Sequence, residues 1–483
     1  MIIQRKSSDA LKQMIGSDYR LFSVLLMTLL LLMLQPMIED QEQSEFIDPL
    51  IGGYLMSPSV SGITLQSVDQ TGKVSSTSIS IPDVVLNDER DTTWDIGNPA
   101  FIALSPDLKA IAFTAVRLLD EIAVFVYDLE RDTLVQYVLP TSTAQGLQPV
   151  WTPDSSRIFL ASQNLIGKTT SYVLNLRTGQ ISALETTYLI GLHWLPDHNR
   201  LLHIGPASCA TPCAADNDLY LTDISELTHQ PITRVNPSEL EIADHMTDAY
   251  IGFGVFTWNP HDERIYVRLG EPGESTARPL ELIYSTGLTG DLRLEADIGT
   301  VYPASGLVTE VHDIFANPLD KRIYTITHTE GPEADIALRW SIMRLDNNGS
   351  MMPVYEKDFE YTDVNILIYS TVSPDGRYVA MAGSDPSRAE NGQLVVVDLV
   401  TGHAILDLSS NLRPVCNVHF TSHTSIVYTQ SETRCLDWRA HQPSNQVIYV
   451  DLVTGIQTEL ITNPSGVTYF IPAESSPSRD VGN

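Results

Sequence analysis

Residues 372–376 read Val-Ser-Pro-Asp-Gly, residues 397–402 read Val-Asp-Leu-Val-Thr-Gly, and this pair of phrases decides the fold. Each phrase lies between two short apolar stretches and has turn chemistry, because proline presets the backbone, aspartate accepts bonds from turn amides and glycine supplies positive φ. The first phrase recurs every 43 to 64 residues, at 103–107, 151–154, 194–197, 258–261, 316–319 and, degraded, 420–423. About four strands per period predict a radial array of small sheets, which is an all-β β-propeller.

The second phrase also recurs once in each period. It stands at 126–129, 174–179, 221–224, 344–349 and 450–455, and in reduced form at 286–291. The pairing of Ser-Pro-Asp-Gly with Val-Asp-Leu-x-Thr-Gly resembles the TolB-type, WD-repeat-like β-propeller family over roughly residues 50–475. The resemblance implies the fold but leaves the function open, since that family includes binding platforms, transport accessories and the propeller lids of peptidases.

The number of blades follows from counting these phrases. Seven Pro-Asp-like turns occur, but an additional strand-end phrase, Ser-Val-Asp-Gln-Thr-Gly-Lys, stands at residues 67–73. Residues 52–81 therefore supply three strands without a first strand, and residues 467–471 supply one strand without a successor. We expect them to combine into an eighth blade, three N-terminal strands plus one C-terminal strand, because a closed array leaves no long unpaired edge. The alternative is a seven-bladed ring with both chain ends as loose additions.

The N-terminal part of the chain predicts a membrane anchor. Residues 21–38 are almost entirely apolar and uncharged, which is near the lower limit for a helix that spans a bilayer. The basic residues Arg5, Lys6, Lys12 and Arg20 precede this stretch, and several acidic residues follow it, so the positive-inside rule places the propeller outside the cytoplasm. A cleaved signal peptide is the alternative, although no small-x-small site ends the stretch.

This interpretation divides the chain into five parts. They are a cytoplasmic segment (1–20), a transmembrane signal anchor (21–38), an acidic linker (39–49), the propeller (50–475) and a disordered tail (476–483). The chain contains 29 Lys and Arg and 60 Asp and Glu, a net charge of −31 at pH 7. Such acidity argues against binding of nucleic acid or of anionic membrane by the propeller.

Four cysteines form two pairs that are local in sequence. Cys209 and Cys213 lie in one predicted loop, and Cys416 and Cys435 flank a strand of the seventh blade. Of the three possible connectivities, the pairing of Cys209 with Cys213 and of Cys416 with Cys435 is expected in an oxidising compartment. A metal site is the rival interpretation, but no Cys-x-x-Cys spacing supports it.

Long loops are expected at one end of the blades only. Turns after first and third strands are minimal, whereas the connections after second strands and between blades are long. The long ones are 205–218, 270–280, 328–339, 384–392 and 431–446 within blades, and 235–252, 297–312 and 354–367 between blades. Elaborated loops on a rigid scaffold usually carry recognition, although insertions that drifted at the surface are an alternative.

Loop 431–446 is the leading candidate for an interaction surface. Its residues Arg434, Trp438, Arg439 and His441 stand out in an acidic chain. Arginine and tryptophan are favoured interface anchors, because each combines a large contact area with directional bonding. The alternative is that Trp438 folds back onto its own blade.

Catalytic motifs are not evident. The chain has no Gly-x-Ser-x-Gly, no His-Glu-x-x-His and no calcium-loop pattern, so no catalytic, cofactor-binding or metal-binding residue is predicted. His193 and His419 share one offset before the turn and are candidates to line the central shaft. Trp151, Trp194 and Trp258, one position later, are expected in the core between blades. Scattered titratable residues are predicted in the inter-blade connections: Asp244, His245, His312 and Asp313.

The sequence therefore favours a membrane-anchored, extracytoplasmic propeller on the periplasmic side or at the cell surface. Its expected role is a protein-interaction scaffold, or an accessory subunit of a membrane-associated assembly, without a cofactor. A propeller enzyme of the lactonase or hydrolase type and a sugar- or peptide-binding receptor are the alternatives. An enzyme would require several titratable groups that converge at one mouth of the shaft.

Overall fold

The alternation of short apolar stretches with turn phrases produces an all-β structure in the computed structural model. The chain divides into residues 1–50 and residues 51–483, and the strands belong to the second unit. The structure describes residues 51–59, 62–82, 84–85, 94–95, 102–117, 121–140, 147–162, 169–186, 189–206, 217–233, 252–270, 281–298, 308–330, 339–359, 366–384, 392–430, 446–462 and 469–472. Among these residues, no helix is long and apolar enough to cross a membrane. The predicted anchor at 21–38 lies outside them, so it stays a prediction.

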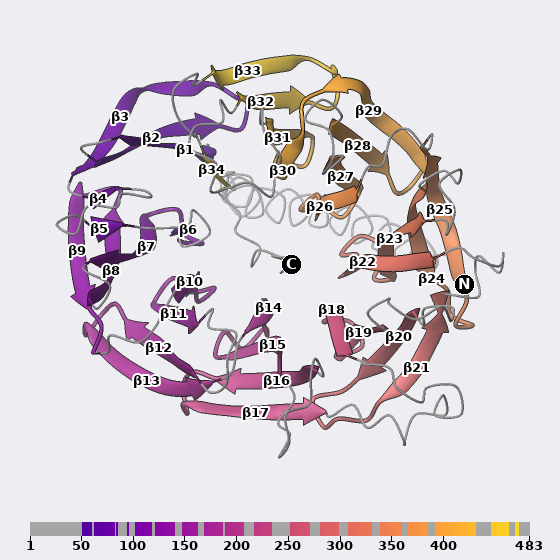
Figure 1. The fold of residues 1–483 in the computed structure, drawn as a ribbon, viewed down its shortest axis with the longest axis horizontal. Helices are drawn as coiled ribbons and strands as arrows, with labels where there is room; N and C mark the ends of the chain where they lie inside the picture. The colour runs from indigo at the N-terminus through magenta and orange to yellow at the C-terminus, as the bar shows by residue number, and fades with distance from the viewer. Residues whose placement is uncertain are drawn as a thin grey trace, which may run out of the picture. The chain divides into compact units, whose positions relative to one another are not determined.

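Eight sheets are arranged around a ring, with one strand of each nearest the centre (Figure 1). Blade one contains β4 (Val84–Val85), β5 (Trp94–Asp95), β6 (Ile102–Leu104), β7 (Ala110–Arg117), β8 (Glu121–Asp128) and β9 (Thr133–Val138). Blade two contains β10 (Leu147–Trp151), β11 (Arg157–Ser162), β12 (Thr169–Asn175) and β13 (Gln180–Thr186), and blade three β14 (Ile190–Trp194), β15 (Arg200–Pro206), β16 (Asn217–Asp223) and β17 (Thr228–Thr233).

The chain continues around the ring in the same order. Blade four contains β18 (Gly252–Asn259), β19 (Arg264–Gly270), β20 (Glu281–Thr286) and β21 (Arg293–Asp297), and blade five β22 (Val308–Ala316), β23 (Ile323–Glu330), β24 (Arg339–Leu345) and β25 (Met351–Asp358). Blade six contains β26 (Ile366–Val372), β27 (Tyr378–Ser384), β28 (Gly392–Asp398) and β29 (His403–Leu412), and blade seven β30 (Val415–Ser422), β31 (Ser425–Gln430), β32 (Gln446–Asp451) and β33 (Gln457–Thr462).

Blade eight combines the two ends of the propeller. Its strands are β1 (Ile51–Ser59), β2 (Gly62–Asp69), β3 (Val74–Pro82) and β34 (Tyr469–Pro472), in the order β3-β2-β1-β34. β34 is antiparallel to β1, with Tyr54 opposite Ile471 and Leu55 opposite Phe470. Eight blades are therefore present, and the seven-bladed alternative is wrong. The sheet has the predicted strand composition, and β34 overlaps the expected strand 467–471 over residues 469–471.

The core of the propeller lies between neighbouring blades. Trp151 and Ile158 of blade two, for example, pack with Ile122 and Val124 of blade one. Second and third strands are buried on both faces, as in β8, whereas outermost strands such as β9 are largely exposed. This explains why the inner stretches are nearly continuous apolar runs.

The repeated tryptophans belong to this core, as predicted. Trp151 and Trp258 are buried, and Trp194 packs against the cluster between blades two and three. Trp151 Nε1 also donates a hydrogen bond of 3.0 Å to the carbonyl oxygen of Ala103 in the preceding blade.

The turn phrases satisfy their own polar groups. In blade six, Ser373 Oγ donates to Asp375 Oδ1 at 2.6 Å, and the amides of Gly376 and Tyr378 are bonded to Ser373. At the end of the third strand, the amide of Val400 donates to Asp398 Oδ1 at 2.9 Å. These aspartates accept hydrogen bonds within their own turns, as the turn phrases predict. We call this end of the blades the turn end, and the opposite end, where second strands finish and third strands begin, the connection end.

The connection between blades four and five differs from its expected bounds. The first and innermost strand of blade five, β22, already begins at Val308. His312 and Asp313 therefore lie in this strand. The prediction that these two residues occupy an inter-blade connection was wrong, because a β-bulge and a histidine interrupt the apolar pattern of this strand. Asp244 and His245 lie outside the described residues.

Blade eight contacts blade seven through a turn that requires glycine. Gly72 has φ +78°, and a Cβ added there would lie 2.5 Å from Cγ of Tyr449, whose hydroxyl donates to the carbonyl oxygen of Gln70 at 3.0 Å. Gly455 has nearly the same φ, +71°, but open space around it.

Gly72→Ala should therefore lower the free energy of unfolding by about 2–4 kcal/mol, from a clash added to backbone strain. Gly455→Ala should cost only about 1 kcal/mol, from the strain alone. Urea unfolding measures both, and equal losses in the two variants would contradict the contact between blades seven and eight.

Candidate functional site between blades four and five

Charged side chains gather near the connection end of blades four and five. Arg268 lies two residues before the end of β19, and Glu281 is the first residue of β20. Glu310 of β22 and His328 of β23 are direct cross-strand partners. We define the charged group as Arg268, Glu281, Glu310, His312, Asp313 and His328.

Arg268 and Glu281 form the buried centre of the charged group. The guanidinium donates twice to the carboxylate, from Nε to Oε2 at 2.7 Å and from NH2 to Oε1 at 2.5 Å. Burial raises the pKa of Glu281, and the two bonds from Arg268 offset part of that rise. Since breaking a buried pair leaves an uncompensated charge, these two residues hold each other in place.

Glu310 is the accessible member of the charged group. Its side chain is 48% exposed, with one carboxylate oxygen 3.5 Å from Arg268 NH1 and the other 3.4 Å from His328 Nε2. These separations are longer than those of a charge-assisted hydrogen bond, so Glu310 is held less tightly than Glu281.

His312 occupies a β-bulge. The pairing of β22 with β23 shifts between Val311 and Asp313, which leaves His312 as the additional residue. Comparable shifts occur in the innermost strands β14, β18, β26 and β30, so the bulge belongs to the repeat. Burial lowers the pKa of His312 to about 4, and no partner bonds its Nε2 atom.

Asp313 joins blade five to blade six. Its Oδ2 accepts a 2.8 Å hydrogen bond from Ser370 Oγ on β26, and its Oδ1 accepts a hydrogen bond from the amide of Ile314.

A serine that donates directly to a carboxylate, as Ser370 does, lacks the intervening histidine of a nucleophilic triad. The described residues also contain no set of three or more His, Cys, Asp or Glu side chains that could hold a metal ion.

A second buried polar cluster lies within blade three. Thr222 Oγ1 lies 3.0 Å from His203 Nε2 and 2.9 Å from His229 Nδ1, and both imidazole rings stack with Tyr220. Burial lowers the pKa of His203 well below its ordinary range and that of His229 to about 4. The Thr222 hydroxyl has one proton, so it donates to one of these ring nitrogens and accepts a hydrogen bond from the N–H of the other. Each of these groups is satisfied within blade three, so the cluster is structural.

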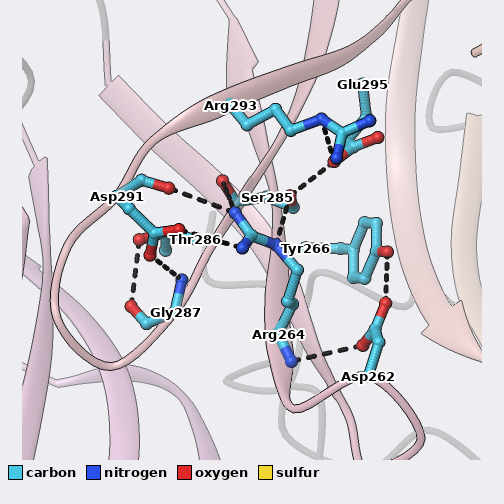
Figure 2. Close-up of polar contacts among 9 residues, drawn as sticks. All are labelled: Asp262, Arg264, Tyr266, Ser285, Thr286, Gly287, Asp291, Arg293 and Glu295. Carbon is cyan, nitrogen blue, oxygen red and sulfur yellow. Dashed lines mark hydrogen bonds and ion pairs between the residues drawn. The ribbon is translucent and has the colours of Figure 1, made fainter.

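Figure 2 shows the contrasting situation at the turn end of blade four. Arg264 donates to Ser285 Oγ at 2.8 Å and to Asp291 Oδ2 at 3.0 Å, and Ser285 donates to Glu295 at 2.6 Å. Tyr266 donates to Asp262 at 2.6 Å. Each of these groups has a partner within its own blade, so the network stabilises the hairpins.

The predicted site residues have different outcomes. His193 and His419 lie on the innermost strands β14 and β30 of blades three and seven, as predicted. Their role in lining the central shaft stays a prediction. Burial lowers the pKa of His419 to about 4, and its ring lies 6.2 Å from that of Phe470. Arg434, Trp438, Arg439, His441, Cys209, Cys213 and Cys435, and the side chain of Cys416, lie outside the described part of the chain. Their interaction and disulfide roles stay predictions.

Sequence patterns missed Arg268, Glu281, Glu310 and His328. The available signal was a charge at the end of an otherwise apolar strand, as in Ile-Tyr-Val-Arg at 265–268 and Glu-Leu-Ile-Tyr at 281–284.

Several solved structures resemble this chain at low sequence identity. No protein-family model and no curated protein matches the sequence. A solved eukaryotic initiation factor is 14% identical, with 88% of this chain and 90% of that chain covered and a TM-score of 0.48. Dipeptidyl peptidase 4 from Porphyromonas gingivalis is 12% identical, with 85% and 58% covered and a TM-score of 0.48. The β-propeller domain of the Trilobed protease from Pyrococcus furiosus is 10% identical, with 73% and 94% covered and a TM-score of 0.41. The resemblance to the TolB-type family stays a prediction.

The buried histidines should make the propeller sensitive to acid. A histidine whose pKa is lower in the folded chain binds protons more readily after unfolding, so the free energy of unfolding is highest above pH 6.5 and falls towards pH 4. For His312 and His419, with folded pKa values of about 4, the loss at pH 5 is about 2 kcal/mol each.

Urea unfolding between pH 7.5 and pH 5 measures this loss. His419→Phe should reduce the difference between the two pH values by about 2 kcal/mol. His423→Gln, at a side chain that is 58% exposed, is the control and should leave the difference unchanged. Equal stability of the wild-type protein at pH 7.5 and pH 5 would contradict this assignment.

Proposed function

We propose that the protein is a membrane-anchored, extracytoplasmic β-propeller that serves as an interaction scaffold or as an accessory subunit of a membrane-associated assembly. Its partner is a protein, and it binds through the connection end of the blades. Neither a cofactor nor nucleic acid is required for this role.

The difference between the two ends of the blades is the observation that supports this proposal. At the turn end, polar groups bond within their own hairpins, as Asp398 and Arg264 do. At the connection end, the chain leaves β15 at Pro206 and enters β16 at Asn217, and leaves β31 at Gln430 and enters β32 at Gln446. The charged group lies near this end. A rigid ring that concentrates its longer connections at one end suits recognition.

Partner capture tests the surface directly. Trp438→Ala and Arg439→Ala should each weaken capture by more than about 1 kcal/mol, because each removes a large anchor. Arg131→Ala is the matched control, since Arg131 lies in a turn-end hairpin and its side chain is 79% exposed. Native pull-down from membranes, with mass spectrometry to identify the partner, gives the readout. Capture that is unchanged in both loop variants would exclude loop 431–446 as the binding surface.

The anchor has its own test, motivated by the apolar stretch 21–38 and the charges that flank it. Membrane fractions should retain the full-length chain, and protease added on the extracytoplasmic side should remove the propeller. A soluble mature chain that starts near residue 40 would contradict the anchor and favour a cleaved signal peptide.

We also infer that blade eight fastens the ring. Its residues pack with blade one through Tyr54 and Met56, and with blade seven through Leu55 and Phe470. Without β34, the inner edge of β1 would lose its ladder bonds and blade seven would lose an apolar contact.

Deletion of residues 464–483 should therefore lower the free energy of unfolding by several kcal/mol, roughly 3–5 from Phe470 and the strand together. Deletion of residues 475–483 removes only the tail beyond β34 and should change it by less than about 0.5 kcal/mol. If the two deletions have equal effects on thermal unfolding, the C-terminal strand does not fasten the ring.

A further inference from the structure

The charged group carries an excess of negative charge. Arg268 contributes one positive charge, whereas Glu281, Glu310 and Asp313 contribute three negative charges when ionised. Arg268 donates both of its short hydrogen bonds to Glu281, and Asp313 accepts a hydrogen bond from Ser370 Oγ. Glu310 is left with contacts of 3.4–3.5 Å and a side chain that is 48% exposed. Among the three carboxylates, Glu310 is thus the most accessible and has the weakest contacts within the protein. Its negative charge would attract a cation from solvent.

His312 adds a second, independent observation. Its Nε2 atom is buried without a partner, although its ring lies within electrostatic range of Asp313, His328, Glu310 and Arg268. A buried polar atom without a partner costs stability, so it calls for an explanation. Two further buried atoms of the same blade, Oγ1 of Thr325 and Oγ1 of Thr327 on the adjacent strand β23, also lack a partner.

We propose that the charged group is a binding site for a primary ammonium group, with Glu310 as the charged acceptor and His312 Nε2 as a second acceptor. A neutral imidazole protonated on Nδ1 presents a lone pair at Nε2, and an ammonium has three hydrogens to donate. Glu310 is the point of first contact, since it is the exposed member.

The described residues offer no set of three metal ligands, so an organic cation fits this site better than a metal ion does. The inference does not depend on the scaffold role, because the same site would serve a receptor or an enzyme. Peptide N-termini and lysine side chains share this chemistry, and the probes below separate them.

Calorimetric titration of the full chain in detergent at pH 7.5 tests the site with three probes. Trialanine amide carries an N-terminal ammonium, Nα-acetyl-lysine methylamide carries a side-chain ammonium, and N-acetyl-trialanine amide carries none. Binding of either of the first two, with at least tenfold weaker binding of the third, is expected and identifies the source. Equal binding of all three probes, or binding of none at millimolar concentration, would overturn the proposal.

Variants connect that binding to the named residues. Glu310→Gln should weaken binding at least tenfold, because it removes the charge and keeps the shape. Glu121→Gln is the matched control, since Glu121 pairs with Arg117 at the connection end of blade one and its side chain is 35% exposed, and binding should be unchanged. Wild-type affinity in Glu310→Gln would overturn the proposal.

His312→Phe separates a binding role from a structural one. It should weaken binding about tenfold yet raise Tm by about 2 °C, because it replaces a buried polar atom that has no partner. A structural role predicts the opposite, a lower Tm with unchanged affinity, and that result would overturn the assignment of Nε2. Glu310→Gln, at a half-exposed position, tests the site independently of how His312→Phe folds.

Discussion

Packing between blades is the constraint on which this structure depends. A four-stranded sheet with two apolar faces cannot bury both of them alone, so each blade must contact a neighbour on either side. The core clusters show this directly, since each large cluster joins residues of two adjacent blades. The cluster that contains Trp258 of blade four, for example, also contains Leu202 and Leu221 of blade three. Any blade at a free end would expose one apolar face to solvent.

This constraint separates structural from functional polar residues. Within the ring, polar groups are tolerated where they bond inside one hairpin, as the network around Arg264 does. The charged group of blades four and five departs from that rule, because Glu310 has only long contacts and His312 Nε2 has no partner. Local violations of otherwise consistent packing are expected at functional sites.

Much of the fold could be predicted because its signals are local. The Pro-Asp turns, the hairpins that follow Asp398 and Asp451, and the core position of Trp151 each depend on a few neighbouring residues. Blade eight could be predicted because the N-terminal residues supply three strands without a first strand, and the C-terminal residues supply one strand without a successor. The candidate site could not be predicted in this way, because Arg268 and Glu310 meet only when two blades pack together. His312 was placed in a connection because a bulge obscures the period of two that identifies a strand.

Native-state hydrogen exchange of the β1 and β34 amides tests most directly whether blade eight fastens the ring. If it does, the amides of Leu55 and Phe470, which pair across the joint, should exchange only through global unfolding, with the same free energy as the amides of β11 in blade two. Exchange of the β34 amides through a local opening, at a free energy several kcal/mol below that of β11, would contradict the account.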